Sequence, residues 1–217
     1  MKPAHSERAV TMTIGSVRLH GSLGLPPDPV GLVLFAHGSG SGRFSPRNTF
    51  VARFLQQGHI ATLLIDLLEE AEAEDRRNVF DIPLLADRVR GATTWLAAQP
   101  DTRALPVGYF GASTGAGAAL QAAALDPDAV AAVVSRGGRP DLAAPYLPQV
   151  KAPTLLIVGG DDEPVIEMNR AAFGKLRCEK RIEIVPGASH LFEESGTLER
   201  VASLAREWFR SHFPHRA

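Results

Sequence analysis

A G-A-S-T-G pentad at residues 111–115 limits the folds that are open to this chain. An apolar run at residues 105–110 precedes the pentad and predicts a short buried strand, and a stretch of small residues at 116–125 predicts a tightly packed helix. A serine on such a sharp strand-to-helix turn projects its hydroxyl, and the flanking glycines allow strained backbone and close helix approach. The pattern predicts an α/β unit with Ser113 as a nucleophile beside the amides of a helix N-terminus.

The rest of the chain repeats the alternation of strand and helix. Further buried strands are predicted at residues 32–36, 60–65, 130–134 and 153–158, and helices at residues 48–57, 82–98, 166–176 and 197–213. Such alternation indicates right-handed βαβ units and a parallel sheet. Residues 9–14 and 17–23 flank Gly15 and Ser16 as an antiparallel hairpin would, and residues 181–185 alternate as in a half-exposed edge strand. We expect one α/β domain over residues 1–217.

Length, charge and cysteine content exclude several classes of protein. A chain of 217 residues can bury one substantial core, and its net charge of -1 gives no overall attraction to nucleic acid or anionic membrane. No apolar run approaches the roughly 20 residues that cross a bilayer, and the first eight residues lack the apolar core of a signal peptide. The single cysteine, Cys178, cannot form an internal disulfide. We therefore expect a cytoplasmic protein, monomeric or homodimeric, whose partner is a small-molecule substrate.

A nucleophilic serine needs a base, and the base needs an orienting acid. In parallel sheets such groups gather at the carboxyl ends of strands. The predicted strand 153–158 runs into G-G-D-D-E-P-V at residues 159–165, and strand 181–185 runs into P-G-A-S-H, which ends at His190. The chain order is Ser, Asp, His, and His190 follows a buried strand beside a glycine, as a base would. Five other histidines do not and are interpreted as surface or core residues: His5, His20, His59, His212 and His215.

With the loop H-G-S-G-S-G at residues 37–42, these motifs resemble the α/β-hydrolase family, and more closely its small dienelactone-hydrolase-like branch, over nearly the whole chain. The resemblance implies the α/β-hydrolase fold, a mostly parallel twisted sheet of about eight strands with helices on both faces. It also implies Ser113 as nucleophile, His190 as general base and then acid, and an aspartate after the seventh strand. Family motifs place this acid three residues before a valine, which selects Asp162. Asp161 is the alternative, and it could instead cap the turn.

The oxyanion hole needs one amide from the residue after the nucleophile, Thr114, and one from the loop after the third strand. By resemblance Ser39 supplies the second amide, with Gly40 as the alternative. A phosphate cradle is disfavoured because the loop lacks the lysine of a P-loop and the third glycine of a dinucleotide fingerprint. His37 is interpreted as a brace for this loop. No metal or cofactor is expected.

Four arginines lie in two predicted strand-end loops: Arg43, Arg47, Arg136 and Arg139. They could clamp an anionic or polar substrate group, or they could pair with carboxylates such as Asp66, Asp81 or Asp141 and hold the loops. These loops also resemble a bacterial subgroup of dienelactone-hydrolase-like proteins, some of which are joined to phosphoribosyltransferase domains.

Two further features bear on the substrate. The acidic residues 69–75 are interpreted as a solvated loop or helical turn that could overhang the site, and residues 135–152 are too short for a cap domain. An open cleft follows, which favours small or exposed substrates. Dienelactone hydrolases use a cysteine nucleophile, so the serine here makes dienelactone an unsafe inference.

The sequence therefore predicts a serine hydrolase that cleaves a small ester or thioester through an acyl-enzyme. One alternative directs the same triad to amide hydrolysis, C–C bond hydrolysis or perhydrolysis. The other is a non-catalytic binding module that keeps the fold.

Overall fold

The computed structural model describes residues 6–214; His5 and His215, interpreted above as ordinary histidines, lie outside the described residues. Eight strands form one sheet in the order β1-β2-β4-β3-β5-β6-β7-β8. Their bounds are β1 Ser6–Ile14, β2 Val17–Leu25, β3 Gly31–Ala36, β4 Ile60–Ile65, β5 Val107–Ala112, β6 Ala132–Arg136, β7 Thr154–Gly159 and β8 Lys180–Val185. β1 and β2 pair antiparallel, β2 pairs antiparallel with β4, and all other neighbours are parallel. The predicted edge hairpin and the predicted mostly parallel sheet are confirmed.

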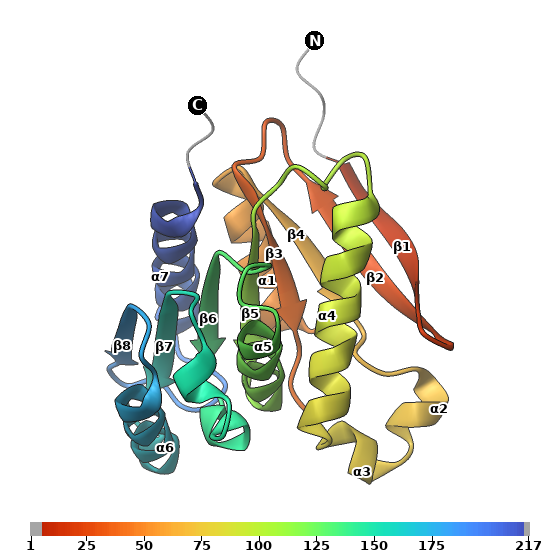
Figure 1. Cartoon of the computed structure of the whole chain (residues 1–217). Coiled ribbons are helices and arrows are strands. Elements are labelled where there is room, and N and C mark those ends of the chain that lie inside the picture. Colours follow the sequence, from red (N-terminus) through yellow and green to blue (C-terminus); the bar gives the residue numbers. More distant parts are fainter. Residues whose placement is uncertain (1–5, 215–217) are drawn as a thin grey trace.

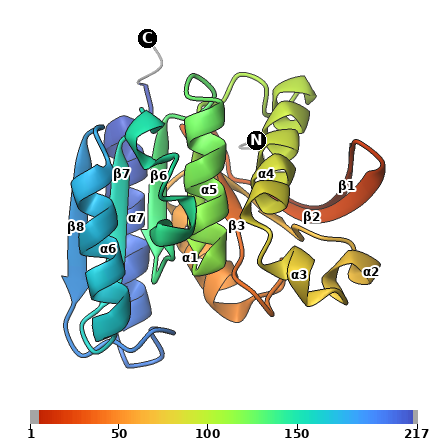
Figure 2. The same ribbon diagram turned by 60° about the horizontal axis from the view of Figure 1, so that its bottom comes forward.

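Helices cover both faces of this sheet (Figure 1). They are α1 Pro46–Gln57, α2 Glu70–Ala73, α3 Arg76–Val79, α4 Ile82–Ala98, α5 Thr114–Leu125, α6 Glu163–Lys175 and α7 Thr197–His212. Helices α1 and α7 contribute buried residues to one core layer, and α4 and α5 contribute to the layer on the opposite face. A second view, turned by 60°, shows α5 and α6 in front of the sheet and α1 and α7 behind it (Figure 2).

The central strands are apolar on both sides because both faces of the sheet are covered. In β3, Leu34 belongs to the core layer under α4 and α5, whereas the next residue, Phe35, belongs to the layer under α1 and α7. The Phe35 ring lies 4.9 Å from the ring of Phe110 on β5, measured between centroids. Burial of each such side chain contributes roughly 1.5–3 kcal/mol to folding. The edge strand β8 is partly exposed, as its alternating sequence predicts.

Most predicted elements agree with the structure, but β5 and β6 each lie two residues further along the chain than predicted. Both strands end in small or polar residues, Gly111 and Ala112 on β5 and Ser135 and Arg136 on β6. These residues stay in the sheet because Gly111 pairs with Ser135 and Ala112 with Arg136. Apolar content alone did not reveal this pairing.

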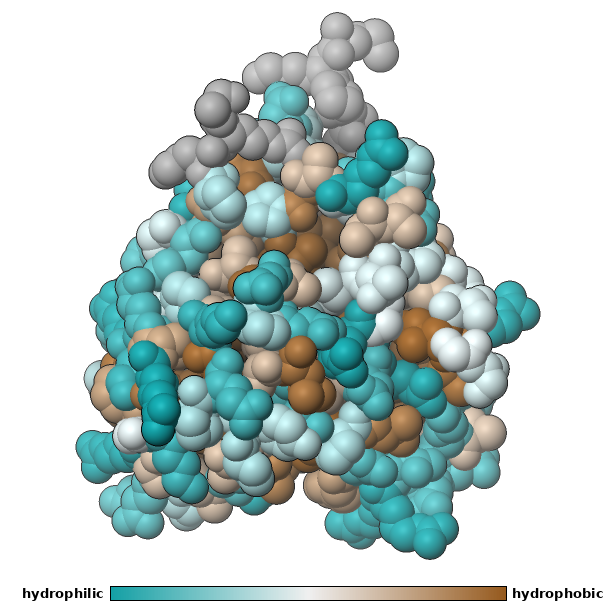
Figure 3. All heavy atoms as spheres, viewed as in Figure 1, coloured by the Kyte–Doolittle hydropathy of each residue, from teal (hydrophilic) through white to brown (hydrophobic). Residues whose placement is uncertain are grey.

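No separate cap domain is present in the described part of the chain. Between β6 and β7 the chain forms two short 3₁₀ turns, η1 Pro140–Ala143 and η2 Leu147–Gln149. In the space-filling view of the α4–α5–α6 face, polar and apolar side chains are interspersed, and the outline is notched at its lower edge (Figure 3). None of the described helices has the length and apolar character to cross a membrane.

Candidate active site

Ser113 forms the tight turn between β5 and α5. Its backbone is held at φ 51 and ψ -122, a left-handed conformation that costs of order 1–3 kcal/mol for a residue other than glycine. Two backbone hydrogen bonds maintain it: the Ser113 amide donates to Arg136 O at 3.3 Å, and the Arg139 amide donates to Ser113 O at 3.0 Å. The loop after β6 therefore holds the predicted nucleophile in its strained conformation.

The two glycines of the pentad are needed because the backbone of other elements lies very close to them. A Cβ atom on Gly111 would lie 2.4 Å from the Cα of Ala116, and one on Gly115 would lie 2.2 Å from the carbonyl oxygen of Ala36. Neither distance leaves room for a side chain. The glycines thus let α5 approach β5 and the end of β3, while the strained backbone belongs to the serine itself.

Asp162 and His190 come together at the ends of β7 and β8. Asp162 is the residue before α6, His190 lies in the loop after β8, and the Nδ1 atom of His190 is 2.7 Å from the Asp162 Oδ2 atom. When Nδ1 donates to the carboxylate, Nε2 is the nitrogen that can accept a proton. Asp161 is exposed, and its backbone amide donates to Ala188 O at 3.0 Å. The structure thus brings Asp162 onto His190 and leaves Asp161 in the turn.

The end of β6 and the loop after it lie close to both the serine turn and the histidine. The Ser113 amide bonds to the carbonyl of Arg136, and a Cβ on the next residue, Gly137, would lie 3.6 Å from His190 Cε1. The ends of β5, β6, β7 and β8 therefore gather the three predicted residues at one edge of the sheet. The Ser113 hydroxyl makes no hydrogen bond to the described residues. In hydrolases without bound substrate, the hydrogen bond between the serine and the histidine is often long and tightens only when substrate binds.

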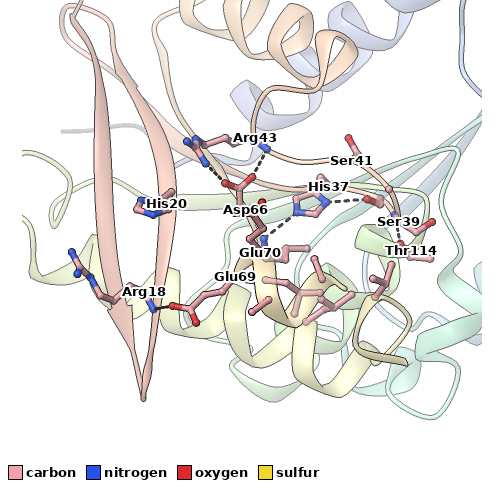
Figure 4. Close-up of a pocket in the computed structure, with 18 residues that line it drawn as sticks. Arg18, His20, His37, Ser39, Ser41, Arg43, Asp66, Glu69, Glu70 and Thr114 are labelled. Atoms are coloured by element: carbon pink, nitrogen blue, oxygen red, sulfur yellow. Dashed lines mark hydrogen bonds and ion pairs between the residues drawn. The ribbon is translucent and has the colours of Figure 1, made fainter. Parts of the chain in front are cut away.

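Hydrogen bonds on both sides of one peptide unit orient the loop after β3. His37 Nδ1 donates to Gly38 O at 2.9 Å, the Ser41 amide donates to the same oxygen at 3.2 Å, and the Leu67 amide donates to His37 Nε2 at 3.0 Å. On the other side of this peptide the Ser39 amide donates to Thr114 Oγ1 at 2.9 Å (Figure 4). Burial lowers the pKa of His37, which keeps the ring neutral and able to accept from Leu67. With these hydrogen bonds His37 braces the loop after β3, as the sequence predicted.

A cavity of about 850 Å³ adjoins the elbow and reaches toward β2 and the segment α2–α3. Gly38, Ser39 and Thr114, the residue after Ser113, line it, and so do apolar side chains such as Leu67 and Leu85. A cavity of this size fits a small molecule.

Acidic residues form part of the cavity wall. Glu69 lines the cavity, and its Oε1 atom accepts a hydrogen bond from the Arg18 amide at 2.6 Å. Glu72 pairs with Arg88 at 2.7 Å. The acidic segment therefore forms part of the cavity wall, and ion pairs and hydrogen bonds tie it to β2 and α4.

The structure separates the four arginines into paired and unpaired groups. Arg43 pairs with Asp66, and Arg139 bonds Asp141 through two nitrogens at 2.9 and 2.8 Å. Both pairs correspond to the loop-holding alternative. Arg47 also forms an ion pair, with 3.1 Å between its Nη1 atom and Glu193 Oε1, so Arg136 is the unpaired one of the four among the described residues.

Arg136 is 6% exposed, and among the described residues its guanidinium bonds only Asn48, at 3.2 Å. Burial and the neighbouring charge of Arg47 lower the pKa of Arg136 to about 10. The Nε atoms of Arg47 and Arg136 are both buried without a hydrogen-bond partner among the described residues. Arg136 therefore carries a buried positive charge that no carboxylate of residues 6–214 contacts.

Sequence reasoning missed two contributors to the site. The Thr114 side chain, not only its amide, takes part in the loop contacts, and His20 lines the cavity although it was interpreted as an ordinary histidine. Nothing in the motif marks the hydroxyl, and the position of His20 depends on the pairing of β2 with β4. Burial raises the pKa of the Cys178 thiol, so it is not an activated nucleophile. In residues 6–214 no cluster of three or more His, Cys, Asp or Glu side chains could hold a metal ion.

The sheet order and the serine turn define an α/β-hydrolase. A model of the dienelactone hydrolase family matches residues 26–212, and the chain belongs to that family. It is 59% identical to a dienelactone hydrolase from Anabaena variabilis of known structure, with a TM-score of 0.95 over 97% of this chain and 99% of that one. Membership in this family, together with the similarity to this dienelactone hydrolase, shows that the chain is a hydrolase.

More distant structures share the fold alone. Est1E from Butyrivibrio proteoclasticus is 16% identical, with a TM-score of 0.80 over 94% of this chain and 98% of that one. The chain is also 56% identical, over 97% of its length, to a putative phosphoribosyl transferase of Mycobacterium tuberculosis, of which the match covers 47%. It thus spans about half the length of that curated relative.

Proposed function

We propose that this chain is a serine hydrolase that cleaves a small ester or thioester through an acyl-enzyme at Ser113. The observation that carries the proposal is the 2.7 Å contact between His190 Nδ1 and Asp162 Oδ2, at the same end of the parallel strands as a serine held at φ 51. Acyl transfer requires a strained serine and a base oriented by an acid, and His190 Nε2 makes no hydrogen bond to the described residues, so it can accept the serine proton.

In the proposed reaction the Ser113 oxygen attacks the substrate carbonyl carbon while His190 Nε2 takes the serine proton. The carbonyl electron pair moves to oxygen and forms a tetrahedral oxyanion. His190 then returns the proton to the leaving group as the carbon–oxygen or carbon–sulfur bond breaks. Water repeats the sequence on the acyl-enzyme and releases the acid and free Ser113. Asp162 fixes the imidazole tautomer and stabilises the imidazolium throughout.

Thr114 and Ser39 form the oxyanion hole in this proposal. The position of Thr114 at the start of α5 supports this role, because helix N-terminal amides are aimed at negative charge. The bond from the Ser39 amide to Thr114 Oγ1 places Ser39 beside the residue after the nucleophile, so Ser39 takes part in the hole through its contact with Thr114. Removal of a single such donor costs on the order of 3 kcal/mol of transition-state stabilisation.

The cavity and Arg136 guide the choice of substrate. A space of about 850 Å³, lined by both apolar and polar side chains, suits a small acyl or alcohol group rather than a polymer. The unpaired charge of Arg136, with Arg47 beside it, favours a substrate that carries an anionic group. The ion pairs of Arg43 and Arg139 give those residues a structural role.

The related proteins are consistent with this proposal at different levels of detail. The dienelactone hydrolase from Anabaena variabilis supports ester-type hydrolysis, although the serine at the elbow departs from the cysteine expected for dienelactone chemistry. The relative from Mycobacterium tuberculosis is named a putative phosphoribosyl transferase, and this chain matches 47% of its length. We propose hydrolase activity for the part of that protein which this chain matches, and we propose that this chain is a monomer or homodimer.

Turnover of para-nitrophenyl esters by the wild-type chain and by Ser113→Ala tests the proposal. We expect the variant to lose at least about 10⁴-fold in kcat while its melting temperature changes little. Unchanged turnover in Ser113→Ala would rule out Ser113 as the nucleophile. A wild-type chain that neither turns over esters nor reacts with a fluorophosphonate would point to the non-catalytic alternative.

A further inference from the structure

The Thr114 hydroxyl lies at the junction of the elbow, the loop after β3 and the cavity. The residue is 3% exposed, yet it lines the cavity together with Gly38 and Ser39 (Figure 4). Its Oγ1 atom is 2.9 Å from the Ser39 amide nitrogen. The side chain therefore occupies the position at which the proposed oxyanion hole brings its two halves together.

The direction of this hydrogen bond leaves the hydroxyl proton available. An amide can only donate, so Thr114 Oγ1 is the acceptor, and its own proton needs a separate acceptor. The hydroxyl donates to none of the described residues. A threonine inside a helix often donates to a carbonyl one turn earlier, but Thr114 is the first residue of α5 and has no preceding helical turn.

We propose that the Thr114 hydroxyl is itself an oxyanion donor, and that the Ser39 amide acts on the oxyanion through it. This inference rests on the proposed function, since it requires a tetrahedral intermediate at Ser113. A hydroxyl that already accepts a hydrogen bond is a stronger donor, because hydrogen bonds in series polarise one another. Thr114 then contributes two donors, its amide and its hydroxyl, and Ser39 supports the second.

The proposed role moves no proton from Thr114. As the Ser113 oxygen bonds to the carbonyl carbon, the carbonyl electron pair becomes a lone pair on oxygen, and the Thr114 hydroxyl donates a hydrogen bond to it. The serine proton goes to His190 and later leaves with the alcohol or thiol. When the intermediate collapses, the carbonyl re-forms and the hydrogen bond weakens. Thr114 thus favours the transition state over the ground state, which is the condition for catalysis.

The loop after β3 is fixed in advance for this arrangement. His37 and the Ser41 amide hold Gly38 O from one side, so the N–H of the same peptide unit, that of Ser39, points the opposite way, to Thr114. No rearrangement of the loop is then needed when the oxyanion forms, and preorganised donors of this kind are the most effective.

Thr114→Val and Thr114→Ser test the proposal, because valine keeps the shape without the hydroxyl and serine restores the hydroxyl. With a para-nitrophenyl ester we expect Thr114→Val to lose about 10²–10³-fold in kcat with little change in KM. Thr114→Ser should stay within a few-fold of wild type. A boronic acid that forms a tetrahedral adduct with Ser113 should bind Thr114→Val more weakly by a similar factor, while the affinity of a planar product acid stays nearly constant. That contrast separates loss of oxyanion stabilisation from a general disturbance of the site.

Two results would overturn the proposal. One is a Thr114→Val variant as fast as wild type or faster, which would make the hydroxyl only an occupant of the Ser39 amide. The other is an equal loss in Thr114→Val and Thr114→Ser, which would place the effect in packing. Labelling of Ser113 by a fluorophosphonate in the same preparations distinguishes these outcomes from failure of the proposed function, since in that case wild type would not be labelled either.

Discussion

The proposed acid–base side and the proposed oxyanion side of the candidate site are built in different ways. On the acid–base side, Asp162 and His190 lie on separate strand-end loops, and one side-chain contact of 2.7 Å joins them. On the oxyanion side, His37, Ser39 and Thr114 belong to a chain of hydrogen bonds in which backbone groups are the main partners. The first side depends on the identity of two side chains, and the second depends on the orientation of a peptide unit. Single substitutions should therefore reduce kcat strongly on the acid–base side and more moderately on the oxyanion side.

The largest effect is expected at Asp162. Asp162→Asn removes the charge and adds an NH2 donor, so the side chain no longer fixes the His190 tautomer, and kcat should fall by about 10⁴-fold. Asp161→Asn is the matched control, because Asp161 is the exposed neighbour on the same turn and should stay within a few-fold of wild type. Steady-state kinetics with one ester compares the two. A larger loss in Asp161→Asn would move the acid to Asp161 and remove the contrast between the two sides.

Arg136 lies between the two sides and should affect one class of substrate. Arg136→Met should reduce kcat/KM for esters with a carboxylate near the acyl carbon by about 10–100-fold, the value of one or two hydrogen bonds to a charged group. Neutral esters of the same size should be nearly unaffected.

Thermal unfolding of Arg136→Met provides the control. Because Arg136 is a buried charge without a carboxylate partner in the described part of the chain, its replacement by an apolar side chain should leave the melting temperature unchanged or raise it. A lower melting temperature together with an equal loss on neutral and anionic esters would show that Arg136 is a structural residue.

The smallest effect is a pH dependence of stability that arises from His37. Burial lowers its pKa from 6.5, so below that pH the unfolded chain binds a proton that the folded chain excludes. The free energy of unfolding should therefore fall as the pH drops below about 6.5, by up to about 1.4 kcal/mol per pH unit, and the contribution is fully present above that pH.

His37→Gln isolates this contribution. Urea unfolding of wild type and variant between pH 5 and 8 should give curves that are furthest apart at the higher pH and that converge at the lower pH. Parallel curves would mean that His37 is not the titrating group.

Much of the proposed acid–base side could be predicted from the sequence, because it is made of side chains that follow the predicted strands. Ser113, Asp162 and His190 each follow a strand, with a glycine two or three residues earlier in the chain, and the topology of a parallel sheet brings such strand ends together. The resemblance to a known family then selected Asp162 over Asp161.

Much of the oxyanion side could not be predicted. The bond from the Ser39 amide to the Thr114 hydroxyl joins residues 75 positions apart and depends on the orientation of one peptide, which leaves no mark on residue type. The separation of the arginines into paired and unpaired groups was also hidden. It depends on the face of β6 from which Arg136 points, and that strand lies two residues beyond its predicted position.

Direct detection of the acyl-enzyme tests the central claim of this account. The wild-type chain is mixed with a para-nitrophenyl ester, quenched in acid within the burst phase, digested and mapped by mass spectrometry. We predict one acyl group on the peptide that contains Ser113, and none in Ser113→Ala. Ester turnover in the wild type without an acyl group on that peptide, or an acyl group on Cys178 instead, would contradict the assignment of Ser113 as nucleophile.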